Sequence, residues 1–305
     1  MADMTDSAFC QVVKDVTGES HYPIVFREMV SAEAVVRGNN KTLDMTDIHP
    51  SERPLVQQIF GSDPAVMAEA ARMIAEKHQP EGFDVNMGCP VYKIVHNFNG
   101  AALMREPALA TKIVKALKAV ISVPLSIKIR LGWSDPTECL TFARILEDAG
   151  ADLITIHGRT KMQGYSGEAD WDMIRRAKNS VSIPVLANGD VHRVELMPKA
   201  LDVSGCNGLL IARGALGNPW IFKHFRDLTT GQKISVVTME ERVRVVKLHL
   251  QLHLKQYGPA AVNTFRKHLA WYFKGLPDFK HFKEPMMKTT TPDELLKILD
   301  QILER

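Results

Sequence analysis

The sequence predicts an α/β protein in which parallel strands alternate with helices, with a small all-helical domain after them. Between residues 24 and 212, short apolar runs rich in β-branched residues recur seven times, and stretches of helical periodicity separate them. Strands that are apolar along their length suit a parallel sheet whose outer face is covered by helices. After residue 230 only helical spacing continues. We therefore expect a (β/α)8 TIM barrel over residues 1–230 and an all-α domain over residues 235–305.

The expected strands follow one another at nearly regular intervals. They are Ile24–Val30, Leu55–Phe60, Gly82–Met87, Pro124–Arg130, Asp152–His157, Pro184–Asn188 and Gly208–Ala212. Seven strands fall one short of the eight of a barrel, because the chain opens with a helix-like segment, Thr5–Val16, and no strand precedes it.

The expected helices lie between the strands and throughout the tail. Pro64, Pro107 and Pro136 each suit the first turn of a helix, where the missing N–H has no intrahelical role. The expected helices are Pro64–Lys77, Pro107–Ala119, Pro136–Ala149 and Trp171–Asn179, followed in the tail by 238–257, 259–275 and 292–304.

Composition excludes several classes of protein. No apolar run reaches the roughly 18 residues of a transmembrane helix, and the polar, acidic start does not resemble a signal peptide. The four cysteines, Cys10, Cys89, Cys139 and Cys206, lie far apart without a CxxC pair, which argues against a disulfide framework and a zinc site. We expect a cytoplasmic monomer that binds neither membrane nor metal.

The charge is divided unevenly along the chain. Residues 1–230 contain 25 Lys and Arg against 27 Asp and Glu, a balance of −2, and residues 231–305 contain 13 against 8, a balance of +5. A basic helical tail is compatible with nucleic-acid binding, although a solvated helical surface has the same composition.

The segment Asp84–Pro90 is the most informative part of the chain, because a buried strand runs there into Gly88, Cys89 and Pro90. Gly88 allows a tight turn that a side chain would obstruct, and Pro90 fixes the direction of the chain after it. The pattern predicts one thiol at the carboxyl end of a strand, where barrel enzymes carry their chemistry. A cysteine beside a turn is, taken alone, more often an inert buried residue.

Other polar residues also stand at or near the carboxyl ends of expected strands. Lys128 and Arg130 lie two residues apart and therefore share one side of the sheet, which suggests an anionic ligand, although Lys128 could also be an ion-paired lysine. His157 alone would more often be a core histidine. The last two strands end in Asn188–Asp190 and in Arg213, where barrel enzymes often bind phosphate.

Taken together, these motifs resemble the tRNA-dihydrouridine synthase family of flavin-dependent oxidoreductases. Individually they are modest, but their order and spacing are specific, and the match runs from Met1 to about Phe222 and more weakly to Gly275. The segments that carry it are Asp84–Pro90 with Lys93, Asn99–Leu103, Lys128–Trp133, Thr155–Thr160 with Ala169–Trp171, Ala187–Asp190, Ala212–Phe222 and Arg266–Gly275.

The resemblance implies FMN at the carboxyl face of the barrel and NADPH or NADH as its reductant. It assigns the catalytic acid to Cys89, which would protonate C5 of a uracil ring while C6 receives hydride from the flavin N5 atom. A lysine beside the flavin would stabilise its anionic reduced form. The residues implied in cofactor binding are Met1, Ala2, Gln58, Lys128, His157, Asn188, Gly189, Asp190, Ala212 and Arg213.

The resemblance also implies tRNA as the substrate. A uridine within folded tRNA must be extruded to reach a barrel pocket, while the basic tail would contact the phosphate backbone. The residues expected at the tRNA are Asn86, Tyr92, Lys93, Arg159, Arg266, Lys267 and Lys274. Relative to the family, Met1 and Ala2 correspond to the last two residues of the first barrel strand, so we expect that strand to be missing.

Two other functions compete with this interpretation. An FMN barrel could act on a free pyrimidine or another small enone, but such an enzyme would not need the basic tail. A tRNA-binding protein without flavin chemistry is the second alternative. The joint presence of Gln58, Cys89, Lys128 and His157 favours catalysis over this non-catalytic alternative.

Overall fold

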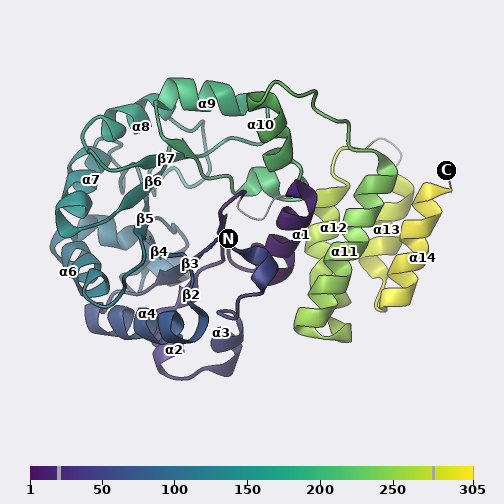
Figure 1. Cartoon of the computed structure of the whole chain (residues 1–305), viewed down its shortest axis with the longest axis horizontal. Coiled ribbons are helices and arrows are strands. Elements are labelled where there is room, and N and C mark those ends of the chain that lie inside the picture. Colours follow the sequence, from purple (N-terminus) through teal and green to yellow (C-terminus); the bar gives the residue numbers. More distant parts are fainter. Residues whose placement is uncertain (19–21, 277–278, 305) are drawn as a thin grey trace.

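The computed structural model describes residues 1–18, 22–276 and 279–304, and its central feature is a curled parallel sheet (Figure 1). Every strand pair in the sheet is parallel. Strand β2 (Val30–Ser31) pairs with the end of β3, and the main order is β1 (Val25–Phe26), β3 (Leu55–Phe60), β4 (Gly82–Asn86), β5 (Leu125–Arg130), β6 (Leu153–His157), β7 (Val185–Asn188) and β8 (Gly208–Leu209). The predicted α/β fold of TIM-barrel type is confirmed.

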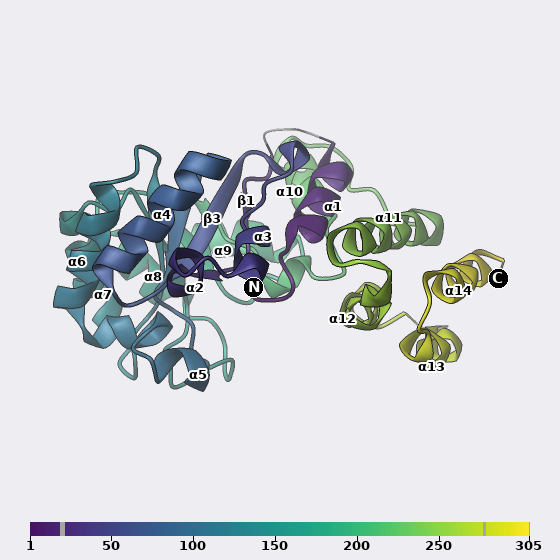
Figure 2. The same ribbon diagram turned by 90° about the horizontal axis from the view of Figure 1, so that it is seen from below.

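Helices cover the outer face of this sheet (Figures 1 and 2), and the main apolar core lies between them and the strands. They are α4 (Pro64–His78), α6 (Pro107–Lys118), α7 (Glu138–Ala149), α8 (Trp171–Lys178) and α9 (Leu196–Ser204). Pro64 begins α4 as expected, and the Asp63 carboxylate accepts hydrogen bonds from the amides of Ala65 and Val66. Since side chains alternate along a strand, the residues between the core positions face the inside of the barrel.

Helix α1 (Ser7–Thr17) lies between the two edges of the sheet. Strands β1 and β8 are the ends of the main strand order, so within the described residues the sheet is curled but open. Phe9 and Val13 of α1 belong to one apolar cluster with Val25 of β1 and with Ala215 and Ile221, which follow β8. The helix therefore packs against both edges.

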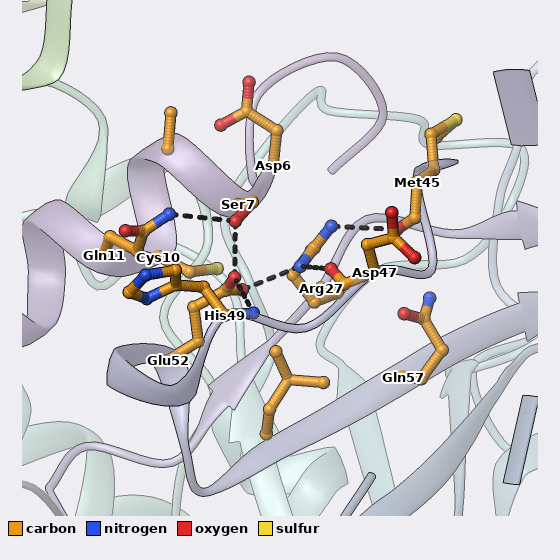
Figure 3. Close-up of polar contacts among 12 residues, drawn as sticks. Asp6, Ser7, Cys10, Gln11, Arg27, Met45, Asp47, His49, Glu52 and Gln57 are labelled. Carbon is orange, nitrogen blue, oxygen red and sulfur yellow. Dashed lines mark hydrogen bonds and ion pairs between the residues drawn. The ribbon is translucent and has the colours of Figure 1, made fainter. Parts of the chain in front are cut away.

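A buried polar network holds the start of α1 against the barrel (Figure 3). The Arg27 guanidinium and the Glu52 carboxylate form an ion pair at 2.7 Å, and both side chains are fully buried. Ser7 donates its hydroxyl hydrogen to Glu52, and Arg27 also donates to the backbone carbonyls of Met45 and Asp47. Removing one partner of such a buried pair would leave an uncompensated charge.

The tail folds into a bundle of helices beside α1. Helix α10 (Ile221–Thr229) precedes it, and α11 (Met239–Tyr257), α12 (Val262–Tyr272), α13 (Lys280–Lys288) and α14 (Pro292–Leu303) form it. Val12 and Val16 of α1 are part of the bundle's apolar core, so α1 packs on the barrel with one side and on the bundle with the other (Figure 1). Among the described helices, none combines the length and the apolar character needed to cross a membrane.

Several elements differ from the sequence expectation. The single strand expected at Ile24–Val30 is two short strands, because the Glu28 amide between them donates to the Thr5 carbonyl at 3.0 Å rather than to the neighbouring strand. The last strand is shorter than expected, and Gly208–Leu209 alone pairs with β7. Helix α7 begins at Glu138 rather than at Pro136, because the Asp135 side chain accepts from the Thr137 amide before the helix starts. The sequence interpretation omitted α9, α10 and α13 and the short helices α2 (Ala32–Val36) and α3 (Asn40–Asp44).

Candidate active site

The inside of the barrel is polar at the carboxyl ends of its strands. The strand register places polar residues side by side across five neighbouring strands, β3 to β7. The pairs are Gln58 with Asp84, Asn86 with Lys128, Lys128 with Thr155, and His157 with Asn188. The neighbouring apolar residues, such as Val85 and Ile127, lie in the outer core. Alternation therefore gathers the predicted polar residues of five strands in one place.

A network around Asp84 organises the bottom of this site. Gln58 donates its amide hydrogen to one carboxylate oxygen of Asp84, and Ser126 donates its hydroxyl hydrogen to the other. Burial raises the pKa of Asp84 and lowers the pKa of Lys128, since desolvation penalises the charged form of each. The two groups partly offset each other, because the charge of each favours ionisation of the other.

Asn86 fixes the turn that carries Cys89. Its carbonyl oxygen accepts hydrogen bonds from the amides of Gly88 at 3.2 Å and Cys89 at 2.9 Å, and its amide nitrogen donates to the Gln58 carbonyl oxygen at 3.0 Å. A Cβ on Gly88 would come within 3.2 Å of the Ile129 backbone, so the close packing of this turn on β5 favours glycine. The half-buried Cys89 thiol is therefore held at the end of β4 by a defined backbone.

The other three cysteines lie in surroundings that disfavour the thiolate. Cys10 and Cys139 are buried, and burial raises the pKa of the Cys139 thiol to about 12 and raises that of Cys10 as well. The pKa of the half-buried Cys206 thiol is also raised by burial. Cys89 is the cysteine that stands among the polar residues of the barrel interior.

Arg130 ties the loops around the thiol together. Its guanidinium donates to the backbone carbonyl of Gly88 at 2.8 Å and to those of Thr160 at 2.9 Å and Gly164 at 2.8 Å. As its sequence position predicted, Arg130 lies on the same side of the strand as Lys128, but its N–H groups bind backbone carbonyls. It positions the Cys89 turn and the loop after β6.

His157 is a neutral histidine surrounded by cations. Burial, together with the charges of Lys128, Arg130, Arg159 and Arg213, lowers its pKa to about 2. The Arg159 guanidinium lies 3.4 Å from its Nε2 atom. Because an arginine can only donate, Nε2 must accept, and the ring therefore carries its hydrogen on Nδ1.

A bidentate ion pair shapes the loop after β7. Arg159 donates to the two carboxylate oxygens of Asp190 at 2.9 and 2.6 Å, and the Ala169 amide donates to the same carboxylate at 2.7 Å. Gly189 has φ of 121°, and a Cβ there would lie 2.7 Å from the Ala169 Cβ atom. This loop therefore requires glycine at position 189 and is held by the buried Arg159. Just before it, the Asn188 side-chain amide donates to the Leu210 carbonyl at 2.7 Å.

Arg213 and Tyr165 form the outer side of this cationic end. The Arg213 guanidinium lies over the Tyr165 ring at 4.3 Å, and the Arg130 guanidinium lies 5.7 Å from the same ring. Arg213 is half exposed and begins the short 3-10 turn Arg213–Ala215, with Ala212 directly before it. Its guanidinium lies 3.9 Å from the Asp190 carboxylate, and its exposed half faces solvent at the end of β8, where an anion could bind.

The residues expected at the tRNA are spread over three regions. Tyr92 and Lys93 are exposed on the short helix α5 (Tyr92–Val95), where Tyr92 stacks on His96 with ring centroids 5.3 Å apart. Arg159 is buried with Asp190, and Asn86 is bound to the Cys89 turn. In the bundle, Arg266 donates to the Thr289 carbonyl, Lys267 is partly exposed, and the exposed Lys274 lies over Trp271.

Met1 and Ala2, which were expected at the cofactor, lie at the start of the described chain near the barrel interior. The Met1 ammonium donates to the Thr5 hydroxyl at 2.6 Å. Burial lowers its pKa, and the charges of Glu28 and Lys128 are close enough to modify it. Ala2 is exposed.

Sequence reasoning missed three contributors to this site. Asp84 and Ser126 lie opposite each other on β4 and β5, two residues before Asn86 and Lys128. The alternation of side chains along a strand, which indicated Asn86 and Lys128, could therefore have indicated them too. Tyr165 lies in a loop without regular structure, and its position near His157 and Arg213 had no sequence signal.

Fold and site define the class of protein as an α/β protein of TIM-barrel type, with a half-buried thiol and a cationic end at the carboxyl ends of its strands. The sequence matches the profile of the "Dihydrouridine synthase (Dus)" family over residues 1–305. The chain belongs to this family, whose members are flavin-dependent oxidoreductases, and the resemblance seen in the sequence is confirmed. The match also includes residues 281–291, where sequence motifs gave no resemblance.

Curated relatives cover almost the whole chain. A probable tRNA-dihydrouridine synthase 1 from Synechocystis sp. is 37% identical over 99% of this chain and 84% of its own length. A probable tRNA-dihydrouridine synthase from Rickettsia conorii is 38% identical over 93% of this chain and 85% of its own length. The tRNA-dihydrouridine synthase B of Pseudomonas aeruginosa is 37% identical over the same shares.

A solved structure supports the fold alone. A 2-naphthoyl-CoA reductase, in complex with 2-naphthoyl-CoA, superposes with a TM-score of 0.53 at 13% identity, and the alignment covers 75% of this chain and 47% of that chain.

Proposed function

We propose that this protein reduces uridine in tRNA to 5,6-dihydrouridine, with FMN as its cofactor and NADPH or NADH as the reductant. The observation that carries the proposal is the half-buried Cys89 thiol at the carboxyl end of β4, on a turn fixed by Asn86, beside the cationic interior around Lys128. Family membership and the curated relatives support the same reaction.

The residues at the carboxyl end fit FMN on their donor chemistry. A flavin phosphate needs cations and N–H donors, and Arg213 is half exposed at the end of β8, beside a loop where Gly189 lets the backbone approach closely. The isoalloxazine ring needs hydrogen-bonding groups in the plane of its edge, which Gln58, Lys128 and the His157 Nδ1–H would supply. Thr155, inside the same barrel, has a buried hydroxyl oxygen without a hydrogen-bond partner among the residues that the structure describes.

Lys128 would place positive charge next to the cofactor. The bound flavin supplies hydride to the uracil ring. Because little water screens charges inside the barrel, the Lys128 ammonium would stabilise an anionic group beside it, and that anion would in turn favour the charged lysine. Asp84 would orient the Gln58 amide through its own hydrogen bond, so that Gln58 meets the ring in one orientation.

Cys89 would act as a general acid that gives its thiol proton to C5 of the uracil ring. The turn amides bound to Asn86 would keep the sulfur in place during proton transfer, and Arg130 would hold the same turn through the Gly88 carbonyl. General acid catalysis of this kind contributes typically about 10²–10⁴-fold to a rate. The thiol must be reprotonated after each turnover.

The substrate would reach the barrel as an extruded nucleotide. Exposed aromatic side chains near the carboxyl ends, Tyr92 and Tyr165, could stack on bases, because every base offers a π face. The bundle carries the basic excess of the chain, with a balance of +5 over residues 231–305. Its exposed Lys274 and partly exposed Lys267 would contact the phosphate backbone.

The direct test is the dihydrouridine content of tRNA after incubation with the purified protein, FMN and NADPH. We expect dihydrouridine in tRNA isolated from a strain without dihydrouridine synthases, and none when free uridine is the substrate. Reduction of free uridine alone would favour the small-molecule alternative. Binding of tRNA without reduction by any nicotinamide donor would favour the non-catalytic one.

A further inference from the structure

A second cluster of chemically active side chains lies away from the barrel interior, where α1 meets the bundle. Asp6 is the N-cap of α1, His253 belongs to α11 and His268 to α12, and each is at most 2% exposed. One carboxylate oxygen and one ring nitrogen from each histidine lie within 4.8 Å of one another. In Figure 3 the Asp6 carboxylate points away from the Ser7–Glu52–Arg27 network.

Ring nitrogens in this cluster lack partners. Within the described residues, His253 Nδ1, His268 Nε2 and His249 Nε2 are all buried without a hydrogen-bond partner. The His268 ring lies 4.4 Å from the His249 ring and 5.9 Å from the His253 ring between centroids, so the three rings are neighbours. Buried polar atoms are nearly always satisfied in native proteins, and three such exceptions together require an explanation.

The hydrogen-bond directions around His253 show what is missing. The Thr264 hydroxyl donates its hydrogen to the Ala261 carbonyl at 2.9 Å, so its oxygen accepts from His253 Nε2, also at 2.9 Å. In the neutral ring this leaves a lone pair on Nδ1, which faces an Asp6 carboxylate oxygen at 3.8 Å. Two acceptors that face each other away from water repel unless a cation lies between them.

The Asp6 carboxylate has a donor on each of its oxygens. The Phe9 amide donates to one oxygen at 2.9 Å, and the Tyr257 hydroxyl donates to the other at 3.1 Å. Each oxygen keeps a further lone pair, and the oxygen bound to Tyr257 is the one that faces His253 Nδ1. The carboxylate is thus held in place by its neighbours with capacity left for a cation.

We propose that Asp6, His253 and His268 bind a Zn²⁺ ion that joins the barrel to the helical bundle. Imidazole nitrogen and carboxylate oxygen are zinc ligands, and donors around a tetrahedral zinc lie about 3.3 Å apart. The donor atoms here lie within 4.8 Å of one another, so binding would draw them together by up to about 1.5 Å. The Thr264 hydroxyl would hold the His253 tautomer as an outer-shell partner. A water molecule would complete the coordination.

The zinc site would have a structural role and is independent of the proposed reaction. Its ligands come from the start of the barrel and from two bundle helices, more than 240 residues apart in the chain. Binding of zinc would therefore stabilise the contact between the barrel and the bundle. This stabilisation would not depend on which substrate the barrel accepts.

The test begins with native protein that carries no polyhistidine tag and has met no chelator. We expect elemental analysis to find one zinc per chain. After removal by a chelator, added Zn²⁺ should raise the melting temperature in proportion to its binding, and Co²⁺ should give the visible spectrum of a tetrahedral site. Protein without stoichiometric zinc, and without a thermal shift on adding Zn²⁺, overturns the proposal and assigns the cation to a proton on His253.

Matched variants separate zinc binding from general stability. D6N keeps an N-cap residue for α1 but loses the anionic oxygen, and H253Q and H268Q each lose one nitrogen ligand. We expect zinc affinity to fall at least about 10- to 100-fold in each. H224Q is the control, because His224 also has a buried, unpartnered Nε2 but lies on α10. Equal zinc loss in H224Q, or none in the three ligand variants, contradicts the assignment.

Discussion

Cys89 is the residue whose side chain would donate a proton in the proposed reaction. C89A should retain bound FMN and NADPH oxidation, because the thiol is expected to touch the substrate rather than hold the cofactor. Formation of dihydrouridine should fall by about 10²–10⁴-fold, the usual contribution of a general acid. Single-turnover reduction of tRNA with pre-reduced enzyme measures this step apart from flavin reduction.

The control for this prediction is C206A, which removes another half-buried thiol between α9 and β8. Its uridine reduction should match that of the unchanged protein. If C89A instead loses its flavin, Cys89 has a structural role and the acid must be another group.

His157 should make the protein less stable in acid. Its pKa is lowered from 6.5 to about 2 in the folded state, so below pH 6.5 the unfolded chain binds a proton that the folded chain does not. The stability from the neutral ring is complete above pH 6.5 and is lost as pH falls. Between pH 7 and pH 5 we expect a loss of about 2 kcal/mol from this residue.

Urea denaturation of the unchanged protein and of H157Q at both pH values measures this loss. The variant should show a pH dependence smaller by that amount, and equal pH dependence in the two proteins would mean that His157 is charged when folded.

The sequence revealed those site residues whose position follows from strand alternation. Lys128, His157 and Asn188 were found because a polar residue interrupts an apolar strand at its end. The partners of Arg159 could not be found in this way, since its pairing with Asp190 joins two loops that only the fold brings together. Roles of the site residues in cofactor and tRNA binding stay predictions.

At the scale of elements, α1 depends on the buried Arg27–Glu52 pair. E52Q should destabilise the protein by about 3–5 kcal/mol, since it leaves the buried Arg27 charge without its partner. R27M should also be costly. The double variant R27M/E52Q removes both charges, so its cost in urea denaturation should be clearly less than the sum of the single costs.

A double cost equal to that sum would show that the two charges act independently. E81Q is a useful comparison, because Glu81 pairs with Arg53 at a partly exposed position, where we expect a smaller cost.

Elements with strong local signals were predicted well. Pro64 and the N-cap Asp63 define the start of α4, which ends one residue from the expected position. Helix α13 was missed because Pro285 lies inside it, and proline usually ends a helix. Its apolar side chains pack on the core of the bundle. The division of Ile24–Val30 into two strands accompanies the hydrogen bond from the Glu28 amide to the Thr5 carbonyl, a contact between separate segments that no local pattern could reveal.

At the scale of the whole molecule, the bundle is the basic part of a nearly balanced chain. Reversing Lys267 and Lys274 to glutamate should weaken tRNA binding and reduce its dependence on salt, since each lost phosphate contact removes roughly 0.7–0.9 from the slope of log K against log[salt]. FMN binding should be unchanged, because both residues lie on or next to α12, outside the barrel. Filter binding at several salt concentrations measures the effect.

The matched control reverses Lys112 and Lys115, which are exposed on α6 of the barrel. This pair changes the net charge equally and should affect tRNA binding much less. Equal losses in the two double variants would indicate a general electrostatic effect without a specific surface.

We propose that the carboxyl end of the barrel binds a flavin that reduces uridine in tRNA. The decisive measurement is the visible absorbance spectrum of the purified protein with added FMN. We predict a bound-flavin spectrum that bleaches with NADPH under anaerobic conditions and recovers on addition of unmodified tRNA. No bound flavin at excess FMN, or a bleached flavin that tRNA does not reoxidise, would contradict the claim.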